Sequence, residues 1–318
     1  MSDTEKDIFA RPEGLDNGDA DVPFIMAPAP FIHGSSSGSK TMAHVMVAML
    51  PALIMSGIVF GGTALMLVGA CTISAMGWEM LSTMVMRKHK STDDLTAAVT
   101  GMLFGLTLPP TFPIIKAILG TFISIVIFKQ LFGGVGKNIL NPAAAGRLAL
   151  YFIFKSDFVY ITPMSDPLDR IYGSTPLVSG DASYFDLIVG GVPGNLGEVS
   201  ALAAMLGIFY LLAMGVTGLW STCSFVGTAY VFSLVTGNDG VYQILACGLL
   251  LTAVFMANDY VTTPLTAPGK ILFGLGAGVI TMTLRLTAGF SEACYAAILI
   301  MDLLTPLIDR ATERRPRK

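Results

Sequence analysis

Long apolar stretches separated by short polar turns run through most of this 318-residue sequence. Most of them are about 20 residues long, which is the length that crosses a lipid bilayer as a helix. Only 13% of the residues are charged, whereas soluble domains have about 25%. We therefore predict an all-α integral membrane protein with about ten transmembrane helices. The stretches lie at about 41–60, 62–86, 95–108, 112–130, 139–154, 199–215, 217–236, 241–257, 270–287 and 291–308.

Two of these stretches end in segments rich in proline and threonine. The stretch at 95–108 is too short for a full crossing and stops at Leu108-Pro109-Pro110, so we interpret it as a half-helix that ends inside the membrane, shielded by protein. The stretch at 241–257 ends in Asn258–Pro264 and has the same ordinal position in the second half of the chain. Paired breaks of this kind predict broken helices in two inverted repeats of five helices each, 41–156 and 199–309.

The distribution of charge predicts how the chain is oriented. With a cytoplasmic N-terminus, the basic cluster at 87–90 lies on the cytoplasmic side, as the positive-inside rule requires. We therefore expect a polar cytoplasmic N-terminal tail over 1–40, without a signal peptide, and a basic cytoplasmic tail over 310–318. The acidic loop at 157–198 is then extracytoplasmic. The net charge of −3 argues neither for nor against a nucleic-acid partner, but no basic stripe runs along the chain, and we expect no such partner.

The four cysteines do not form a recognisable site. Cys71, Cys223, Cys247 and Cys294 all lie inside apolar stretches, and none belongs to a Cys-x-x-Cys motif. We expect small core residues, and neither a disulfide framework nor a metal site built from this chain.

The segment from Lys129 to Arg147 combines glycines, two asparagines and a charge. Asn138 and Asn141 are three residues apart and would share a face if both were helical. Asn141 could equally cap a helix that begins at Pro142. Arg147 would then lie two turns inside an apolar helix, where a charge is costly and usually functional, so we expect an anionic ligand or a buried carboxylate beside it.

Several acidic residues are candidates for handling a cation or a proton. Glu79, Glu292 and Asp302 lie inside apolar stretches, although pairing with another subunit would explain them equally well. Glu198 opens one stretch and could favour a helix N-terminus through the macrodipole. Asp259 closes another stretch and could be a solvated group at the interface.

On its residues alone, the loop segment Asp169–Leu177, with the sequence DRIYGSTPL, reads as an ordinary turn that carries two hydroxyl groups. A family resemblance changes that interpretation. The blocks LPPTFP, KQLFGGVGKNILNPAAAGR, GNLGEVSAL, FMANDYVTTP and ILIMDLLTPLID occur in this order between residues 106 and 309. Together they resemble the family of RnfD, a membrane protein of the Rnf electron-transport complex. That family is related to NqrB, its counterpart in the sodium-pumping NADH:quinone reductase.

The resemblance implies a covalently bound FMN, joined through its phosphate to a threonine hydroxyl by a dedicated flavin transferase. The family pattern resembles Asp-Gly-x-Ser-Gly-Ala-Thr, in which Asp169 matches the aspartate, Gly173 the glycine and Thr175 the acceptor. The sequence departs from the pattern at Arg170, Tyr172 and Ser174. Ser174 is therefore a rival acceptor.

The resemblance also implies a second, noncovalent flavin, riboflavin, inside the helix bundle, with contacts among Asn138, Asn141, Arg147 and Asp259. It implies a fold similar to that of urea channels. The expected function is electron relay within a translocase of a bacterial or archaeal cell membrane. That complex couples electron transfer between ferredoxin and NAD to translocation of Na⁺ or H⁺. The expected partners are the other Rnf subunits, among them a second FMN-bearing subunit.

Three rival functions remain open on sequence grounds. The NqrB protein of the quinone reductase is the nearest, but it usually has a larger N-terminal region. A channel or transporter of the same fold without a redox role would not need the segment from Asp169 to Thr175. A structural subunit that only anchors partners is the third. A test for bound flavin would distinguish the redox relay from the channel and from the anchoring subunit. It would not distinguish it from NqrB, which also binds flavin.

Overall fold

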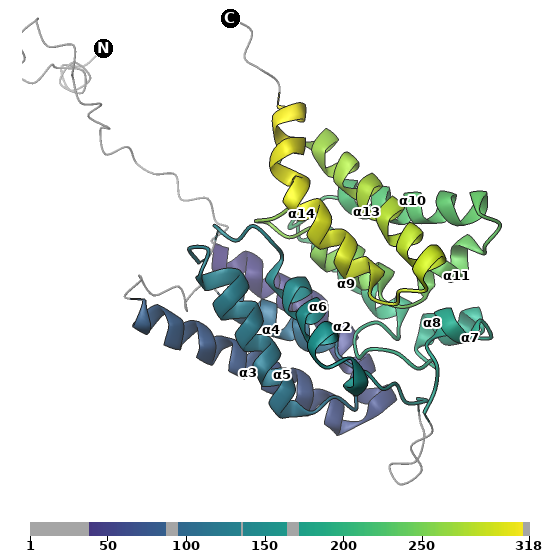
Figure 1. Cartoon of the computed structure of the whole chain (residues 1–318), viewed down its shortest axis with the longest axis horizontal. Coiled ribbons are helices and arrows are strands. Elements are labelled where there is room, and N and C mark those ends of the chain that lie inside the picture. The colour runs from purple at the N-terminus through teal and green to yellow at the C-terminus, as the bar shows by residue number, and fades with distance from the viewer. Residues whose placement is uncertain (1–37, 87–94, 135, 164–171, 314–318) are drawn as a thin grey trace, which may run out of the picture. The chain divides into compact units, whose positions relative to one another are not determined.

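The apolar stretches fold into helices that pack against one another (Figure 1). The structure is a computed structural model and describes residues 38–86, 95–134, 136–163 and 172–313. Within these residues the β-type pairing is limited to an isolated bridge between Ile161 and Tyr172. The prediction of an all-helical chain is therefore confirmed for the described residues.

Before the loop at 157–198, which we call the outer loop after its expected side of the membrane, each predicted stretch corresponds to a helix. The elements are α2 (Gly38–Phe60), α3 (Gly62–Val85), α4 (Thr96–Leu106), α5 (Ile114–Phe122), which continues as the π-helix η3 (Ile123–Gln130), and α6 (Pro142–Ile153). The loop itself carries a short 3₁₀ turn η4 (Lys155–Asp157) and two short helices, α7 (Pro176–Ser179) and α8 (Tyr184–Val189).

After the outer loop the helices again follow the apolar stretches. They are α9 (Ala201–Ala213), α10 (Trp220–Val235), α11 (Gly240–Leu245), α12 (Leu249–Leu251), which continues as the π-helix η5 (Thr252–Met256), α13 (Ala267–Ala288) and α14 (Ala293–Thr312). Among the described helices, α2, α3 and α13 are each long and apolar enough to cross a membrane. Together with shorter apolar helices such as α4, α9 and α10, they give the chain the character of a membrane protein.

The backbone carbonyl groups at the break after α4 accept hydrogen bonds from another part of the chain, as we expected for a half-helix shielded by protein. Two prolines follow Leu108, and a proline has no N–H with which to continue a helix. The freed carbonyl oxygens of Leu106 and Leu108 accept hydrogen bonds from the backbone N–H of Gly197 at 2.6 Å and of Leu196 at 2.9 Å. A Cβ atom at Gly197 would lie 2.8 Å from Cβ of Leu106, so only glycine permits this close approach.

The stretch at 241–257, predicted as one continuous run, is divided in the structure. Helix α11 ends at Leu245, and the backbone turns at Cys247 and Gly248 with φ of 48° and 71° before α12 begins. The left-handed conformation at both residues breaks the helix although no proline is present. After η5, the Asn258 amide donates to the carbonyl oxygens of Ala253 at 3.1 Å and Val254 at 2.9 Å, which satisfies the second break.

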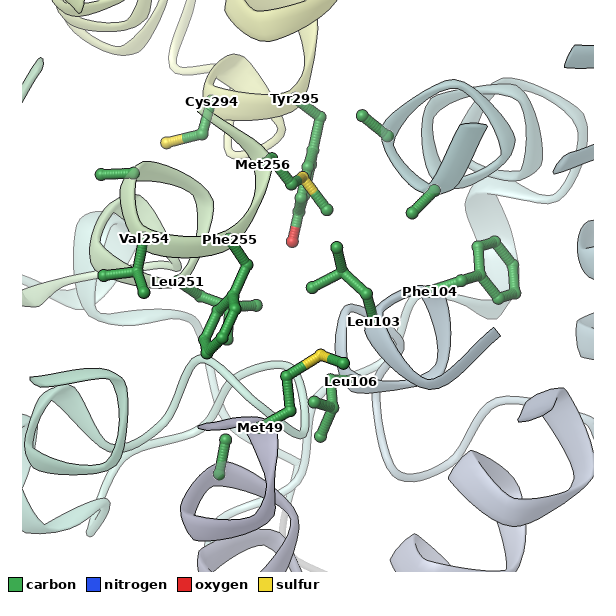
Figure 2. Close-up of a cluster of buried hydrophobic side chains, with 14 of the residues drawn as sticks. Met49, Leu103, Phe104, Leu106, Leu251, Val254, Phe255, Met256, Cys294 and Tyr295 are labelled. Carbon is green, nitrogen blue, oxygen red and sulfur yellow. The ribbon is translucent and has the colours of Figure 1, made fainter. Parts of the chain in front are cut away.

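A single large apolar core joins helices from both sides of the outer loop. Figure 2 shows Met49 of α2, Leu103 of α4, Phe255 of η5 and Tyr295 of α14 converging in it. Small residues let the helices approach closely, as in other membrane helix pairs. At Gly101, for example, a Cβ atom would lie 2.6 Å from Cβ of Ala75 on the neighbouring α3.

Candidate functional site

The segment that carries the expected flavin acceptors is held by its glycine. The Gly173 N–H donates to the carbonyl oxygen of Tyr160 at 3.1 Å, next to the bridge between Ile161 and Tyr172. A Cβ atom at Gly173 would lie 2.6 Å from Cγ of Pro193. Gly173 therefore lets the segment pack closely against the loop that leads to α9. A larger residue at this position would push the segment away from that loop. Asp169 lies outside the described residues.

The two hydroxyl side chains of this segment differ in exposure. Ser174 is exposed, whereas Thr175 is 6% exposed and lies at the N-cap position of α7. The Thr175 carbonyl oxygen accepts hydrogen bonds from the N–H groups of Val178 and Ser179, but its hydroxyl does not cap the helix. The hydroxyl is thus not committed to a capping role, although the surrounding chain covers it.

The short helices α7 and α8 are each joined to α11 by a tyrosine. The Tyr242 hydroxyl donates to the carbonyl oxygen of Pro176 at 2.7 Å. The Tyr184 hydroxyl donates to Asp239, which also caps α11 by accepting from the N–H groups of Val241 and Tyr242. The hydrogen bond from Tyr184 lowers the pKa of the Asp239 carboxyl, so this carboxylate stays ionised as the cap requires.

Arg147 is fully buried and contacts the outer loop. Its Nη2 donates to Oε1 of Glu292 at 2.8 Å, and its Nε donates to the carbonyl oxygen of Thr107 at 2.8 Å. The guanidinium lies 4.1 Å from the centre of the Phe158 ring, a cation–π distance. The buried carboxylate predicted beside Arg147 is therefore Glu292. The arginine joins α6, the broken end of α4 and the start of α14.

Glu198 lies beside the same ion pair but has different partners. It does not cap α9, because the N-cap of that helix is Ser200, two residues further on. The Glu198 carboxyl instead contacts the Tyr295 hydroxyl and the Asn195 amide, the latter at 2.9 Å. The sequence analysis missed Tyr295 and Asn195. The spacing of Asn195 and Glu198 in GNLGE was a local signal, whereas nothing near Tyr295 pointed to Glu198.

The two asparagines before α6 have separate roles. Asn141 caps the helix, since its Oδ1 accepts from the N–H groups of Ala143 at 3.1 Å and Ala144 at 3.2 Å, with Pro142 as the first helical residue. Asn138 precedes the helix and donates to the carbonyl oxygen of Leu140 at 3.3 Å. The alternative in which both asparagines share a helix face is therefore wrong, because the chain before Asn141 is not helical.

Two of the residues expected around riboflavin, Asn141 and Asp259, line one pocket. Arg147 and Asn138 are not part of its lining. The cavity volume of this pocket is about 60 Å³. It has apolar walls, among them Val99, Leu103 and Phe255, together with a few polar side chains. Apolar walls with a few polar side chains are the lining that small-molecule sites share.

Further acidic residues in the apolar helices are also held within the chain. The Asp302 carboxylate accepts from the backbone N–H of Asn141 at 2.8 Å. Glu79 pairs with Lys129 at 2.7 Å, and both side chains are buried. Pairing with another subunit is thus not needed to explain Glu79. Within the described part of the chain, no group of three or more His, Cys, Asp or Glu residues could hold a metal ion.

Comparison with known proteins identifies the family. Residues 25–318 match the family described as NQR2, RnfD, RnfE. The chain belongs to this family. The expected relationship to RnfD and to NqrB is therefore confirmed at the level of the family.

Three relatives show how the chain sits within the family. It is 37% identical to the D subunit of the Na(+)-translocating ferredoxin:NAD(+) oxidoreductase complex of Acetobacterium woodii, over 91% of this chain and 94% of the relative. It is 33% identical to the D subunit of the proton-translocating ferredoxin:NAD(+) oxidoreductase complex of Clostridium ljungdahlii, over 91% and 95%. It is also 33% identical to the B subunit of the Na(+)-translocating NADH-quinone reductase of Chromohalobacter salexigens, over 81% and 68%.

Proposed function

We propose that this chain is the D-type membrane subunit of an ion-translocating ferredoxin:NAD(+) oxidoreductase complex, in which it relays electrons through bound flavin. The observation that carries the proposal is the match with the D-type relative from Acetobacterium woodii along nearly the full length of both chains. The partners are the other subunits of such a complex, including a second FMN-bearing subunit. The relatives are named for Na⁺ in one case and for protons in another, so either ion suits the proposal.

The alternative is the B-type subunit of a Na⁺-translocating NADH:quinone reductase. The match with that protein in Chromohalobacter salexigens is also strong, but it covers only 68% of the relative, whereas the D-type relatives are matched over more than nine tenths. The difference in length favours the D type.

We further propose that the helices form two inverted repeats in a bundle of ten spans. The contacts among the helices support this arrangement, because equivalent pairs meet on both sides of the outer loop. Helix α3 packs on α5 as α10 packs on α13, and α5 packs on α6 as α13 packs on α14. The pairs α2 with α9 and α6 with α14 also meet, as elements related by a pseudo-two-fold axis would. The termini are then cytoplasmic, with the flavin-bearing loop outside.

The outer segment suits a covalent FMN in two respects. It carries two adjacent hydroxyls, and Gly173 holds it in a fixed position next to the exposed Ser174. Thr175 is the proposed acceptor, and its attachment by a flavin transferase requires the turn at α7 to open enough to expose the hydroxyl. A bound flavin supplies the one-electron chemistry, while the residues of the chain set its position and exclude water. The pocket lined by Asn141 and Asp259 is the proposed site for riboflavin.

Covalent flavin is tested by in-gel fluorescence. The subunit, made together with a flavin transferase, is run on a denaturing gel and viewed under ultraviolet light. Wild type and Ser174→Ala should fluoresce, and Thr175→Val should be dark. Fluorescence that survives Thr175→Val but disappears in Ser174→Ala moves the attachment site to the exposed serine. If the wild type does not fluoresce, the proposal of a covalent flavin is wrong, and a channel or an anchoring subunit becomes the better explanation.

Riboflavin is tested by extraction. Flavin released from the purified complex by denaturation should include riboflavin in the wild type. Substitution of Asp259 by Asn or of Asn141 by Ala should lower its amount while the covalent FMN stays. Arg147→Met tests one of the two remaining contacts that the resemblance implies, the other being Asn138. If the riboflavin content and electron transfer are unchanged in an Arg147→Met complex that still folds, Arg147 is not a riboflavin ligand.

A further inference from the structure

Glu198 belongs to a buried polar cluster that lies between the outer segment and the broken helices. We define the Glu198 cluster as Glu198, Asn195, Tyr295, Glu292 and Arg147. The ion pair between Arg147 and Glu292 closes one side of the cluster, and Phe158 of the outer loop covers the guanidinium. Tyr295 lies on the first turn of α14, three residues after Glu292, and its ring centre is 5.4 Å from the Arg147 guanidinium.

Glu198 differs from Glu79 and Glu292 in having only neutral partners, a property that it shares with Asp302. Glu292 pairs with Arg147, and Glu79 pairs with Lys129. The oxygens of Glu198 meet a tyrosine hydroxyl and an amide N–H, and no described cation lies within salt-bridge distance. A carboxylate in low dielectric without a cationic partner is costly to keep ionised, and protonation removes that cost.

The cluster also has unused hydrogen-bonding capacity. Among its buried atoms, Oδ1 of Asn195, Oε2 of Glu292 and Nη1 of Arg147 have no hydrogen-bond partner in the part of the chain that the structure describes. Asn195 is 5% exposed, and its Nδ2 donates to Oε2 of Glu198. When Glu198 is ionised, this amide N–H and the Tyr295 hydroxyl donate to it. When Glu198 carries a proton, rotation of the Asn195 amide turns Oδ1 towards it as an acceptor.

We propose that Glu198 binds and releases a single proton, and that the Glu198 cluster is a proton-binding site of this chain. An O–H bond forms on the Glu198 carboxylate with a proton taken from water, and its rupture returns the proton to water. Glu198 is partly exposed, whereas Glu292 is 1% exposed, so Glu198 is the carboxyl that can exchange. A part for this proton site in ion translocation rests on the proposed function of the chain.

The charged surroundings of Glu198 come from several elements. Arg285 of α13 donates to the carbonyl oxygens of Gln243 and Cys247, at 2.8 Å in both cases, and brings a second positive charge near the cluster. The titratable and charged groups that act on Glu198 or are acted on by it are Glu292, Arg147, Arg285, Cys247, Cys294, Tyr295 and Tyr160. The backbone of Tyr160 also holds Gly173, so the cluster lies next to the segment with the proposed flavin acceptors.

Infrared spectroscopy of the purified complex tests the proton site directly. The absorbance of protonated carboxylic acids is followed while the pH is lowered at constant salt. Because the other carboxyl groups of the complex also titrate, the spectra are compared as differences. The wild type minus Glu198→Gln should show a titrating carboxylic-acid band that belongs to Glu198. Asp157→Asn is the matched control, because Asp157 also lies at the outer loop but is paired with Lys116. It should retain the band of the wild type.

Glu198→Asp keeps the test decisive if the Gln variant does not assemble, since the shorter side chain should retain a titrating band at a shifted position. Identical titrating bands in the wild type and Glu198→Gln, or in the wild type and Glu198→Asp, overturn the proposal. So does a band that responds to added Na⁺ at constant pH, which would make the cluster a Na⁺ site. In-gel flavin fluorescence of the same samples reports the proposed function separately, so the two can fail independently.

Discussion

Arg147 shows how one buried charge can hold several elements of a membrane protein. Its guanidinium bonds to the Glu292 carboxylate on one side and to the Thr107 carbonyl oxygen at the end of the half-helix α4 on the other. The carbonyl oxygen of Thr107 lies in the break after α4, where no helical N–H can reach it. The arginine thus stabilises the broken helix as well as neutralising Glu292.

Removal of this cation should be strongly destabilising. Arg147→Met leaves Glu292 as an uncompensated buried charge, and we expect a loss of about 3–5 kcal/mol in the free energy of unfolding. The Lys116–Asp157 pair is the matched control, because its lysine side chain is 37% exposed. Lys116→Met should cost less than about 1 kcal/mol. Denaturant titration of the purified protein in detergent measures both.

The double variant separates the ion pair from general packing. Arg147→Met combined with Glu292→Met replaces two buried charges by apolar side chains and should recover much of the stability that the single variant loses. Equal losses in the single and double variants would show that the guanidinium acts through its bond to Thr107 and its contact with Phe158, not through Glu292.

At the scale of residues, the sequence indicated which buried charges need a partner, but it did not indicate which residue the partner is. A charge inside an apolar helix needs compensation, so a carboxylate near Arg147 was predictable. Its identity was not, because Glu292 is 145 residues away and the pairing depends on how α6 and α14 meet. The same limit applies to Glu198 and Tyr295. Exposure was also hidden, since no local pattern indicates that Ser174 is exposed while its neighbour Thr175 is buried.

At the scale of elements, close packing between α3 and α4 depends on a glycine. A Cβ atom at Gly101 would lie 2.6 Å from Cβ of Ala75 and 2.7 Å from the carbonyl oxygen of Cys71, which is backbone and cannot give way. The tight contact brings the half-helix α4 into the core, where it forms a wall of the pocket that Asn141 and Asp259 line.

Gly101→Ala should therefore separate the two helices. We expect a loss of about 1–3 kcal/mol in stability, the usual cost of overpacking, and less riboflavin retained by the complex. Gly69→Ala on α3 is the control, because a Cβ atom there meets nothing within 4 Å. It should be neutral or slightly stabilising, since alanine favours helix more than glycine does. Equal stability of the two variants would contradict the packing argument.

Helix positions were predictable from the sequence because each helix needs a long apolar stretch and each gap needs polar or breaking residues. The start of α6 was predictable in the same way from Asn141 and Pro142. The division between α11 and α12 was not, since it lies at Cys247 and Gly248 without a proline. There the chain is held by Arg285, a contact from another helix that overrides the local preference for a continuous helix.

At the scale of the whole molecule, helices on the two sides of the outer loop share one core. Leu103 and Leu106 from before the loop pack with Leu251 and Phe255 from after it (Figure 2). The ends of α4 and η5, where the helices are broken, both reach this core. The backbone carbonyl groups there accept hydrogen bonds from side chains or backbone of the protein. A bundle built in this way can hold polar groups and ligands deep inside while its outer surface stays apolar.

The proposed orientation in the membrane makes a sharp prediction for chemical labelling. Val178 lies on α7 and is 72% exposed, and Glu313 is exposed at the end of α14. Single cysteines are placed at these positions after Cys223, the exposed native cysteine among the described residues, is replaced by serine. In intact cells, a membrane-impermeant thiol reagent should label Val178→Cys, and Glu313→Cys only after the cells are opened.

The parent chain with Cys223→Ser is the control and should remain unlabelled, since its other native cysteines lie inside the bundle and are less accessible. Labelling of both introduced cysteines in intact cells would place the end of α14 outside as well, which an odd number of crossings per repeat does not allow. Labelling of Glu313→Cys alone in intact cells would show that the chain has the opposite orientation in the membrane. The flavin-bearing loop would then face the cytoplasm, and the Glu198 cluster would exchange protons with that side instead.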